Sequence, residues 1–289
     1  MGTFYLWILS APQGEILQAM LKLKAMRNEL PDWPLWTLPA AFLMITAGTL
    51  FATILLDLMI KAVASVAGAH VSLKSPGVIL GSTLIQDAAF IGGTVATVWL
   101  ATKRAKASDF GIVGVAHKWR AAFMALGAWV LFLAVTATWQ NLVNSHEKQS
   151  ITKDLGVDQS TLLWAGSAFL LTVAAPIAEE FVFRGFVFPL VWKKLGLIAG
   201  ILSSSALFGL LHIGSSPPVL LLPLAFLGVT LCLMRLGTGS LIPCFALHSV
   251  NNSVAFGVME KMPATHVLEL VAVGLAATLT IGSIIVRRA

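Results

Sequence analysis

Apolar runs of about 20 residues recur along the whole chain, and they constrain the fold more than any other feature. A helix needs roughly 20 such residues to cross the hydrocarbon core of a bilayer. Only 11% of the residues are charged, whereas a soluble domain has about 25%. The sequence therefore predicts an all-α polytopic membrane protein. We predict eight spans, at residues 38–60, 77–100, 121–143, 161–190, 196–213, 217–235, 240–258 and 266–286.

The chain before the first span is expected to lie at the membrane surface. Residues 14–30 place Leu17, Met20 and Leu21 on one side of a helix, which suits an amphipathic interfacial helix. An ordinary surface helix packed against the bundle is the alternative. We divide the single integral membrane domain into an N-terminal interfacial segment, the first three spans and a five-helix catalytic part, at residues 1–37, 38–150 and 151–289.

The positions of lysine and arginine predict the orientation of the chain. Of the 19 such residues, 14, with Arg184 included, fall on the side of the N terminus. The five on the other side are Lys61, Lys74, Lys148, Lys153 and Lys261. Because cytoplasmic loops carry the basic excess, both termini are expected in the cytoplasm, and a bacterial source would place the protein in the plasma (inner) membrane. This pattern also explains the net charge of +6 without a nucleic-acid partner.

Three short polar patterns interrupt the apolar spans. They read EEFVFR at 179–184, FGLLH at 208–212 and HSVNN at 248–252. In each pattern two residues are four apart and share one face of a helix. The pairs are Glu180 with Arg184, Phe208 with His212, and His248 with Asn252. Ionisable groups at membrane depth are expensive and usually face a bundle interior or a water cavity, so the patterns predict a functional site.

The residue types suggest a division of labour within this site. Arg184 has the helical spacing for an ion pair with Glu180, while Glu179 points about 100° away around the helix and is free for another partner. His248 and Asn252 can both donate hydrogen bonds and so stabilise an oxyanion. For each pattern the alternative is structural: a Glu–Arg clamp, or hydrogen bonds between helices.

The predicted spans place Glu179 and His212 at different depths in the membrane, although both are expected in one site. Glu179 lies 11 residues from Leu190, or about 16 Å along a helix. His212 lies 17 residues from Leu195, or about 25 Å, and would sit too high unless its helix tilts or begins later.

In this order, the three motifs resemble the CAAX protease and bacteriocin-processing (Abi) family, which includes the Ras-converting CAAX prenyl endopeptidases. The resemblance covers roughly residues 160–258. It implies an eight-helix intramembrane endopeptidase of the glutamate type that needs no cofactor. Its substrate would be a membrane-associated or lipidated peptide, reached through a water-filled cavity open to the cytoplasm. A monomer is the default expectation.

The resemblance also implies roles for individual residues. Glu179 would activate the attacking water together with His212. His248 and Asn252 would form the oxyanion hole, and Glu180 with Arg184 would support the reacting groups.

Three other functions are compatible with the sequence. A zinc protease would use Glu179, His212 and His248 as ligands around an open position, although the local HExxH pattern of such enzymes is absent. A non-proteolytic binding or immunity protein would hold a membrane partner without cutting it. A transporter or proton relay would use acids in other spans, namely Asp57, Asp87 and Glu269.

Overall fold

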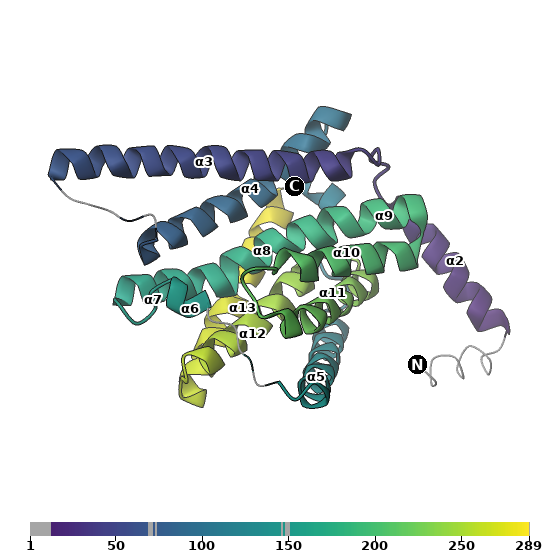
Figure 1. Cartoon of the computed structure of the whole chain (residues 1–289). Helices are drawn as coiled ribbons and strands as arrows, with labels where there is room; N and C mark the ends of the chain where they lie inside the picture. The colour runs from purple at the N-terminus through teal and green to yellow at the C-terminus, as the bar shows by residue number, and fades with distance from the viewer. Residues whose placement is uncertain (1–12, 69–71, 73, 146, 148–150, 289) are drawn as a thin grey trace.

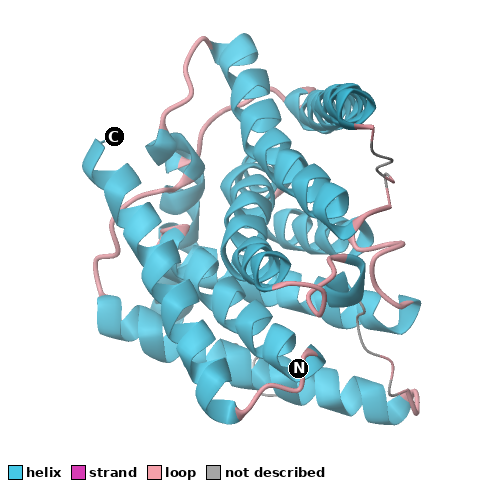
Figure 2. Ribbon diagram, turned by 90° about the vertical axis from the view of Figure 1, so that its left-hand side faces the viewer, coloured by secondary structure: helices cyan, strands magenta, loops and turns pink. Residues whose placement is uncertain are grey.

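The computed structural model describes the whole chain except residues 1–12, 69–71, 73, 146, 148–150 and 289, so part of the predicted N-terminal segment lies outside it. The described residues are helical and contain no β-strand (Figure 1, Figure 2). The α-helices are α2 (Gln13–Glu29), α3 (Thr37–Ala67), α4 (Pro76–Thr102), α5 (Lys118–Leu142), α6 (Ile151–Asp154), α7 (Thr161–Phe169), α8 (Ala175–Glu180), α9 (Phe188–Leu195), α10 (Leu197–Leu211), α11 (Pro218–Thr238), α12 (Ile242–Met259) and α13 (Ala264–Arg288).

Every predicted span corresponds to a helix, and the protein is a multi-pass membrane protein. In the described part of the chain, six helices are long and apolar enough to cross a membrane: Thr37–Val66, Pro76–Thr102, Lys118–Leu142, Thr161–Leu195, Pro218–Thr238 and Ala264–Arg288. Helix α10 is short, with 15 residues, and α12 has 18 residues that include a histidine and two asparagines. The count of eight spans therefore stays a prediction.

The fourth span is one helix of 35 residues that runs through α7, α8 and α9. Two π-helical segments interrupt it, Leu170–Ala174 and Phe181–Val187. Each is followed within two residues by a proline, Pro176 or Pro189, which has no N–H for the regular helical ladder. Widening of the helix absorbs this loss. The helix ends at Leu195, five residues beyond the predicted boundary.

Small residues bring α10 and α11 close together. A Cβ added at Gly228 would lie 2.8 Å from the Cα of Ser205, and one at Gly209 would lie 2.9 Å from the backbone oxygen of Leu221. Contacts this short are possible only because both positions are glycine. The backbones of α10 and α11 therefore approach each other directly beside the polar residues of the bundle.

Helix α2 docks on the end of α9. The side chain of Arg27 donates a hydrogen bond to the backbone oxygen of Lys193 over 2.9 Å, and Lys193 in turn donates to the backbone oxygen of Asn28 over 2.9 Å. Leu23 and Met26 pack against the cluster that contains Phe188, Trp192 and Cys232. Leu17, Met20 and Leu21 are exposed. The helix is present as expected, whereas its amphipathic interfacial role stays a prediction.

Candidate active site

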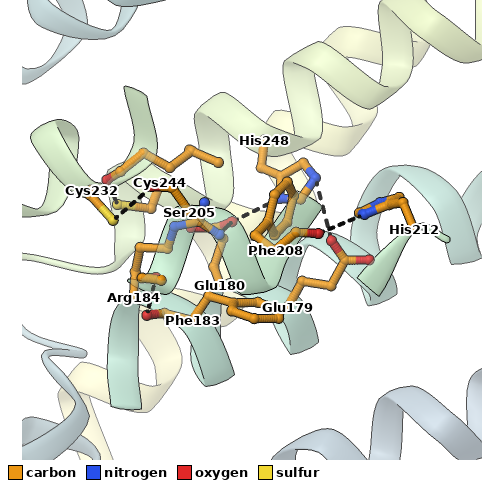
Figure 3. A network of polar contacts seen from close by, with 12 residues as sticks. Glu179, Glu180, Phe183, Arg184, Ser205, Phe208, His212, Cys232, Cys244 and His248 are labelled. Atoms are coloured by element: carbon orange, nitrogen blue, oxygen red, sulfur yellow. Dashed lines mark hydrogen bonds and ion pairs between the residues drawn. The ribbon is translucent and has the colours of Figure 1, made fainter. Parts of the chain in front are cut away.

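One cavity of about 270 Å³ collects the four residues that the sequence predicts to be catalytic. Glu179 reaches it from α8, His212 from the C-terminal end of α10, and both His248 and Asn252 from α12. Figure 3 shows Glu179 and the two histidines gathered at one end of the polar network and Arg184 at the other. Residues more than 30 positions apart in the sequence thus share one space.

The depth conflict disappears because the fourth span is longer than predicted. Glu179 lies 16 residues before Leu195, the end of α9, and His212 lies 15 residues after Leu197, the start of α10. At about 1.5 Å per residue, Glu179 lies about 24 Å and His212 about 22 Å along the helices from the junction of α9 and α10. The two residues can therefore lie at similar depths. The question of depth that the sequence left open came from the early boundary at Leu190, because α9 ends at Leu195.

Glu180 is the centre of a buried ionic network. Its Oε1 accepts a hydrogen bond from Nη1 of Arg184 over 2.8 Å and one from Nδ1 of His248 over 2.9 Å. The side chains of Glu180 and Arg184 are fully buried. The guanidinium also lies over the ring of Phe208, with Cζ 4.4 Å from the ring centroid, which favours a cation. The predicted ion pair is present and extends to His248.

Glu179 occupies a different environment from its neighbour. Its side chain is 14% exposed and borders the cavity, whereas Glu180 has no exposure. The Oε2 of Glu179 lies 3.8 Å from Nε2 of His248 and, among the described residues, accepts no hydrogen bond. Adjacent positions on a helix differ by about 100°, which explains how one acid pairs and the other faces the cavity.

His212 is held in a defined tautomer. Its Nδ1 lies 2.9 Å from the backbone oxygen of Phe208. A carbonyl can only accept, so Nδ1 carries the hydrogen and Nε2 of the neutral ring keeps its lone pair. The buried ring of Phe208 packs against both histidines, with centroid distances of 5.1 Å to His212 and 5.6 Å to His248. Phe208 therefore orients the two imidazoles by packing.

Asn252 has a partner that the sequence did not suggest. Its Nδ2 donates to the backbone oxygen of Leu171 over 2.9 Å. Leu171 lies in the first π-helical segment, where the N–H five residues further on would normally donate to its oxygen. That residue is Pro176, which has no N–H. Asn252 thus satisfies a carbonyl that proline leaves without its helical donor. The second N–H of this amide remains available, and Asn252 borders the cavity.

Two neighbours extend this amide contact across the bundle. Nε1 of Trp129 lies 3.4 Å from Oδ1 of Asn251, whose Nδ2 lies 3.3 Å from Oδ1 of Asn252. Sequence reasoning missed both Trp129 and Asn251. The second asparagine of the HSVNN motif was the available signal for Asn251, and no local pattern pointed to α5.

The acids outside the three motifs are separated from one another. Asp57 pairs with Lys61 over 2.7 Å on α3, and Glu269 borders a separate cavity of about 510 Å³. Asp87 is buried and lines the same cavity as Glu179, and its Oδ2 has no hydrogen-bond partner among the described residues. The three acids therefore form no common path, and Asp87 joins the site from a part of the chain that the motifs do not cover.

The zinc alternative gains no support from the side-chain arrangement. Within the described ranges, no group of three or more His, Cys, Asp and Glu residues is placed so that it can hold a metal ion. Both ring nitrogens of His248 already face carboxylates, Nδ1 toward Glu180 and Nε2 toward Glu179. Independence from a cofactor stays a prediction.

The family comparison coincides with this geometry. Residues 161–254 match a family model described as type II CAAX prenyl endopeptidase Rce1-like. The match begins at α7, ends within α12 and contains all three motifs, so the predicted relationship is confirmed over these residues. It supports a membrane protease of the CAAX type. The comparison with curated proteins found no match, and neither did the comparison with solved structures.

Proposed function

We propose that the protein is an intramembrane endopeptidase of the glutamate type. The observation that carries the proposal is the contrast between two adjacent acids. Glu180 is fully buried and is held by Arg184 and His248, whereas the side chain of Glu179 is 14% exposed and borders the cavity. A general base must be within reach of a water and free to accept its proton, and Glu179 meets both conditions.

Hydrolysis can proceed with these groups alone. The Glu179 carboxylate takes a proton from a water that His212 Nε2 helps to orient, and the water oxygen bonds to the carbonyl carbon of the peptide. The electron pair of the C=O bond moves to the oxygen, where N–H groups of His248 and Asn252 stabilise the negative charge. The intermediate then collapses, the C–N bond breaks, and the proton on Glu179 passes to the leaving nitrogen.

The ionic network supports the charge state that this mechanism needs. Because Nδ1 of His248 donates to Glu180, its Nε2 can donate to an oxyanion only when the ring is protonated. In that state Glu179 and Glu180 balance Arg184 and His248, so the cluster has no net charge. Buried charges are tolerated when opposite charges are paired, and here Oε1 of Glu180 pairs with both cations.

The test is cleavage of a quenched fluorescent peptide library by the detergent-purified protein. The library contains prenylated and unprenylated members, and wild type is compared with Glu179→Ala, each with and without a strong chelator. We expect cleavage that the substitution abolishes and the chelator leaves intact. Loss with the chelator would indicate the zinc mechanism. Equal cleavage by both proteins would contradict the role of Glu179, and the absence of cleavage throughout would favour a binding protein.

A further inference from the structure

The catalytic cavity opens toward one end of the bundle. Its lining includes Ser215 and Ser216, which follow α10, Met259, the last residue of α12, and Ile151, the first residue of α6. All four lie where helices end or begin, on the same side of the site. The cavity therefore extends from Glu179 to the surface formed by the start of α6 and by the connections from α10 to α11 and from α12 to α13.

The connections between helices place the C terminus and the docked α2 at the opposite end. The long fourth helix starts with α7 beside the cavity mouth and ends with α9, where α2 docks (Figure 1). Helices α10 and α12 run toward the mouth, whereas α11 and α13 run away from it. The last residues of α13, Arg287 and Arg288, are thus separated from the mouth by the length of a helix.

Basic residues are concentrated at the end away from the mouth. This end carries all the Lys and Arg residues of α2, of residues 103–120, of the α9–α10 junction and of the last turn of α13. The mouth end carries far fewer. In the described part of the chain they are Lys61, Lys74, Lys153 and Lys261. The asymmetry predicted from the sequence thus runs along the same axis as the cavity.

We infer that the active site receives its peptide from the extracytoplasmic side of the membrane. The excess of Lys and Arg marks the cytoplasmic face, and the cavity mouth is at the other face. The sequence predicts cytoplasmic termini and a cavity open to the cytoplasm, and the structure does not allow both, because the cavity mouth and the C-terminal end of α13 lie at opposite ends of the bundle. The substrate is a peptide segment exposed outside the cytoplasm, such as the external part of a membrane-anchored chain. The orientation of the cavity does not depend on the proposed protease activity, whereas the statement that a peptide binds there rests on that activity.

Cysteine labelling tests the orientation without any catalysis. Ser215→Cys places a thiol at the cavity mouth and Ser108→Cys places one at the opposite end, and both positions are exposed. The native Cys232 and Cys244 are buried. In intact spheroplasts, a membrane-impermeant maleimide is expected to label Ser215→Cys, whereas Ser108→Cys is labelled only after permeabilisation. Lys261→Cys, also exposed near the mouth, should behave as Ser215→Cys does.

Reversed labelling, or labelling of Ser215→Cys and Lys261→Cys only after permeabilisation, overturns the inference. The same labelling in a Glu179→Ala background separates orientation from activity, because the result does not depend on proteolysis. A second measurement uses the best peptide of the library with sealed vesicles. Right-side-out vesicles should cleave external peptide at least tenfold faster than inside-out vesicles, and the opposite ratio contradicts the inference.

Discussion

Helix α3 and the long helix over Thr161–Leu195 are both apolar and long enough to cross a membrane, yet they are buried very differently. In their most apolar stretches, 6% of the residues of α3 are buried, compared with 44% in the long helix. Leu43, Phe51 and Met59 of α3 are exposed, as expected of side chains that meet lipid. Hydropathy thus identifies both helices as spans, and burial by protein separates the helix that builds the site from one that mainly meets lipid.

Each of these helices also carries an acid–base pair with the same spacing. Asp57 and Lys61 pair over 2.7 Å on α3, and Glu180 and Arg184 pair over 2.8 Å in the long helix. The Lys61 side chain is 60% exposed, whereas that of Arg184 is not exposed at all. Spacing alone therefore does not determine what a pair contributes. The buried pair fixes a neighbouring histidine, and the exposed pair contacts nothing in the site.

Replacement of the two basic residues should give the largest difference in stability. Arg184→Met leaves Glu180 buried with one cationic partner fewer, which destabilises by about 3–5 kcal/mol. Lys61→Met removes an exposed partner and should change the free energy of unfolding by less than about 1 kcal/mol. Thermal unfolding in detergent measures both. Equal shifts in melting temperature for the two variants would show that the network around Glu180 is not stabilising.

Asn252→Ala should affect both turnover and stability. Loss of an oxyanion donor lowers turnover by roughly 10²–10³, and the unsatisfied Leu171 carbonyl destabilises by about 1–3 kcal/mol. Pro176→Ala restores an N–H that can reach this carbonyl. The double variant is therefore expected to regain stability while its turnover stays low. Recovery of turnover as well would assign Asn252 to positioning the helix and remove it from the oxyanion hole.

Two leucine truncations compare the helices directly. Leu190→Ala empties a fully buried position in α9 and should destabilise by about 2–5 kcal/mol. Leu43→Ala shortens an exposed side chain on α3 and should stay within about 0.5 kcal/mol of wild type. Unfolding of both variants under the same conditions compares the two losses in the free energy of unfolding. A large loss for Leu43→Ala would indicate that α3 packs against a partner subunit.

The smallest effects are expected at two glycines. A Cβ at Gly228 meets the backbone of Ser205 at 2.8 Å, so Gly228→Ala should destabilise by about 1–3 kcal/mol. A Cβ at Gly92 in α4 meets no atom within 4 Å, and Gly92→Ala should stabilise by about 0.5–1 kcal/mol through lower chain entropy. Melting temperatures that move in the same direction would contradict the close packing of α10 on α11.

The sequence predicts much of this architecture and part of the site. Apolar runs locate the helices, and the four-residue spacing within each motif correctly pairs Glu180 with Arg184. Periodicity does not reveal the π-helical segments, because a proline such as Pro176 can end, bend or widen a helix. Without them the ends of the fourth span and the partner of Asn252 cannot be derived. Asp87 and Trp129 reach the site through packing between distant helices, which a single sequence does not encode in any local pattern.

The central claim is that the two adjacent acids have different functions, and paired amide substitutions test it most directly. Glu179→Gln and Glu180→Gln are compared with wild type for cleavage of the best library peptide and for melting temperature. The account predicts that Glu179→Gln abolishes cleavage at an unchanged melting temperature, whereas Glu180→Gln lowers the melting temperature because Arg184 and His248 lose their carboxylate. Wild-type cleavage by Glu179→Gln, with its fold intact, would contradict the account.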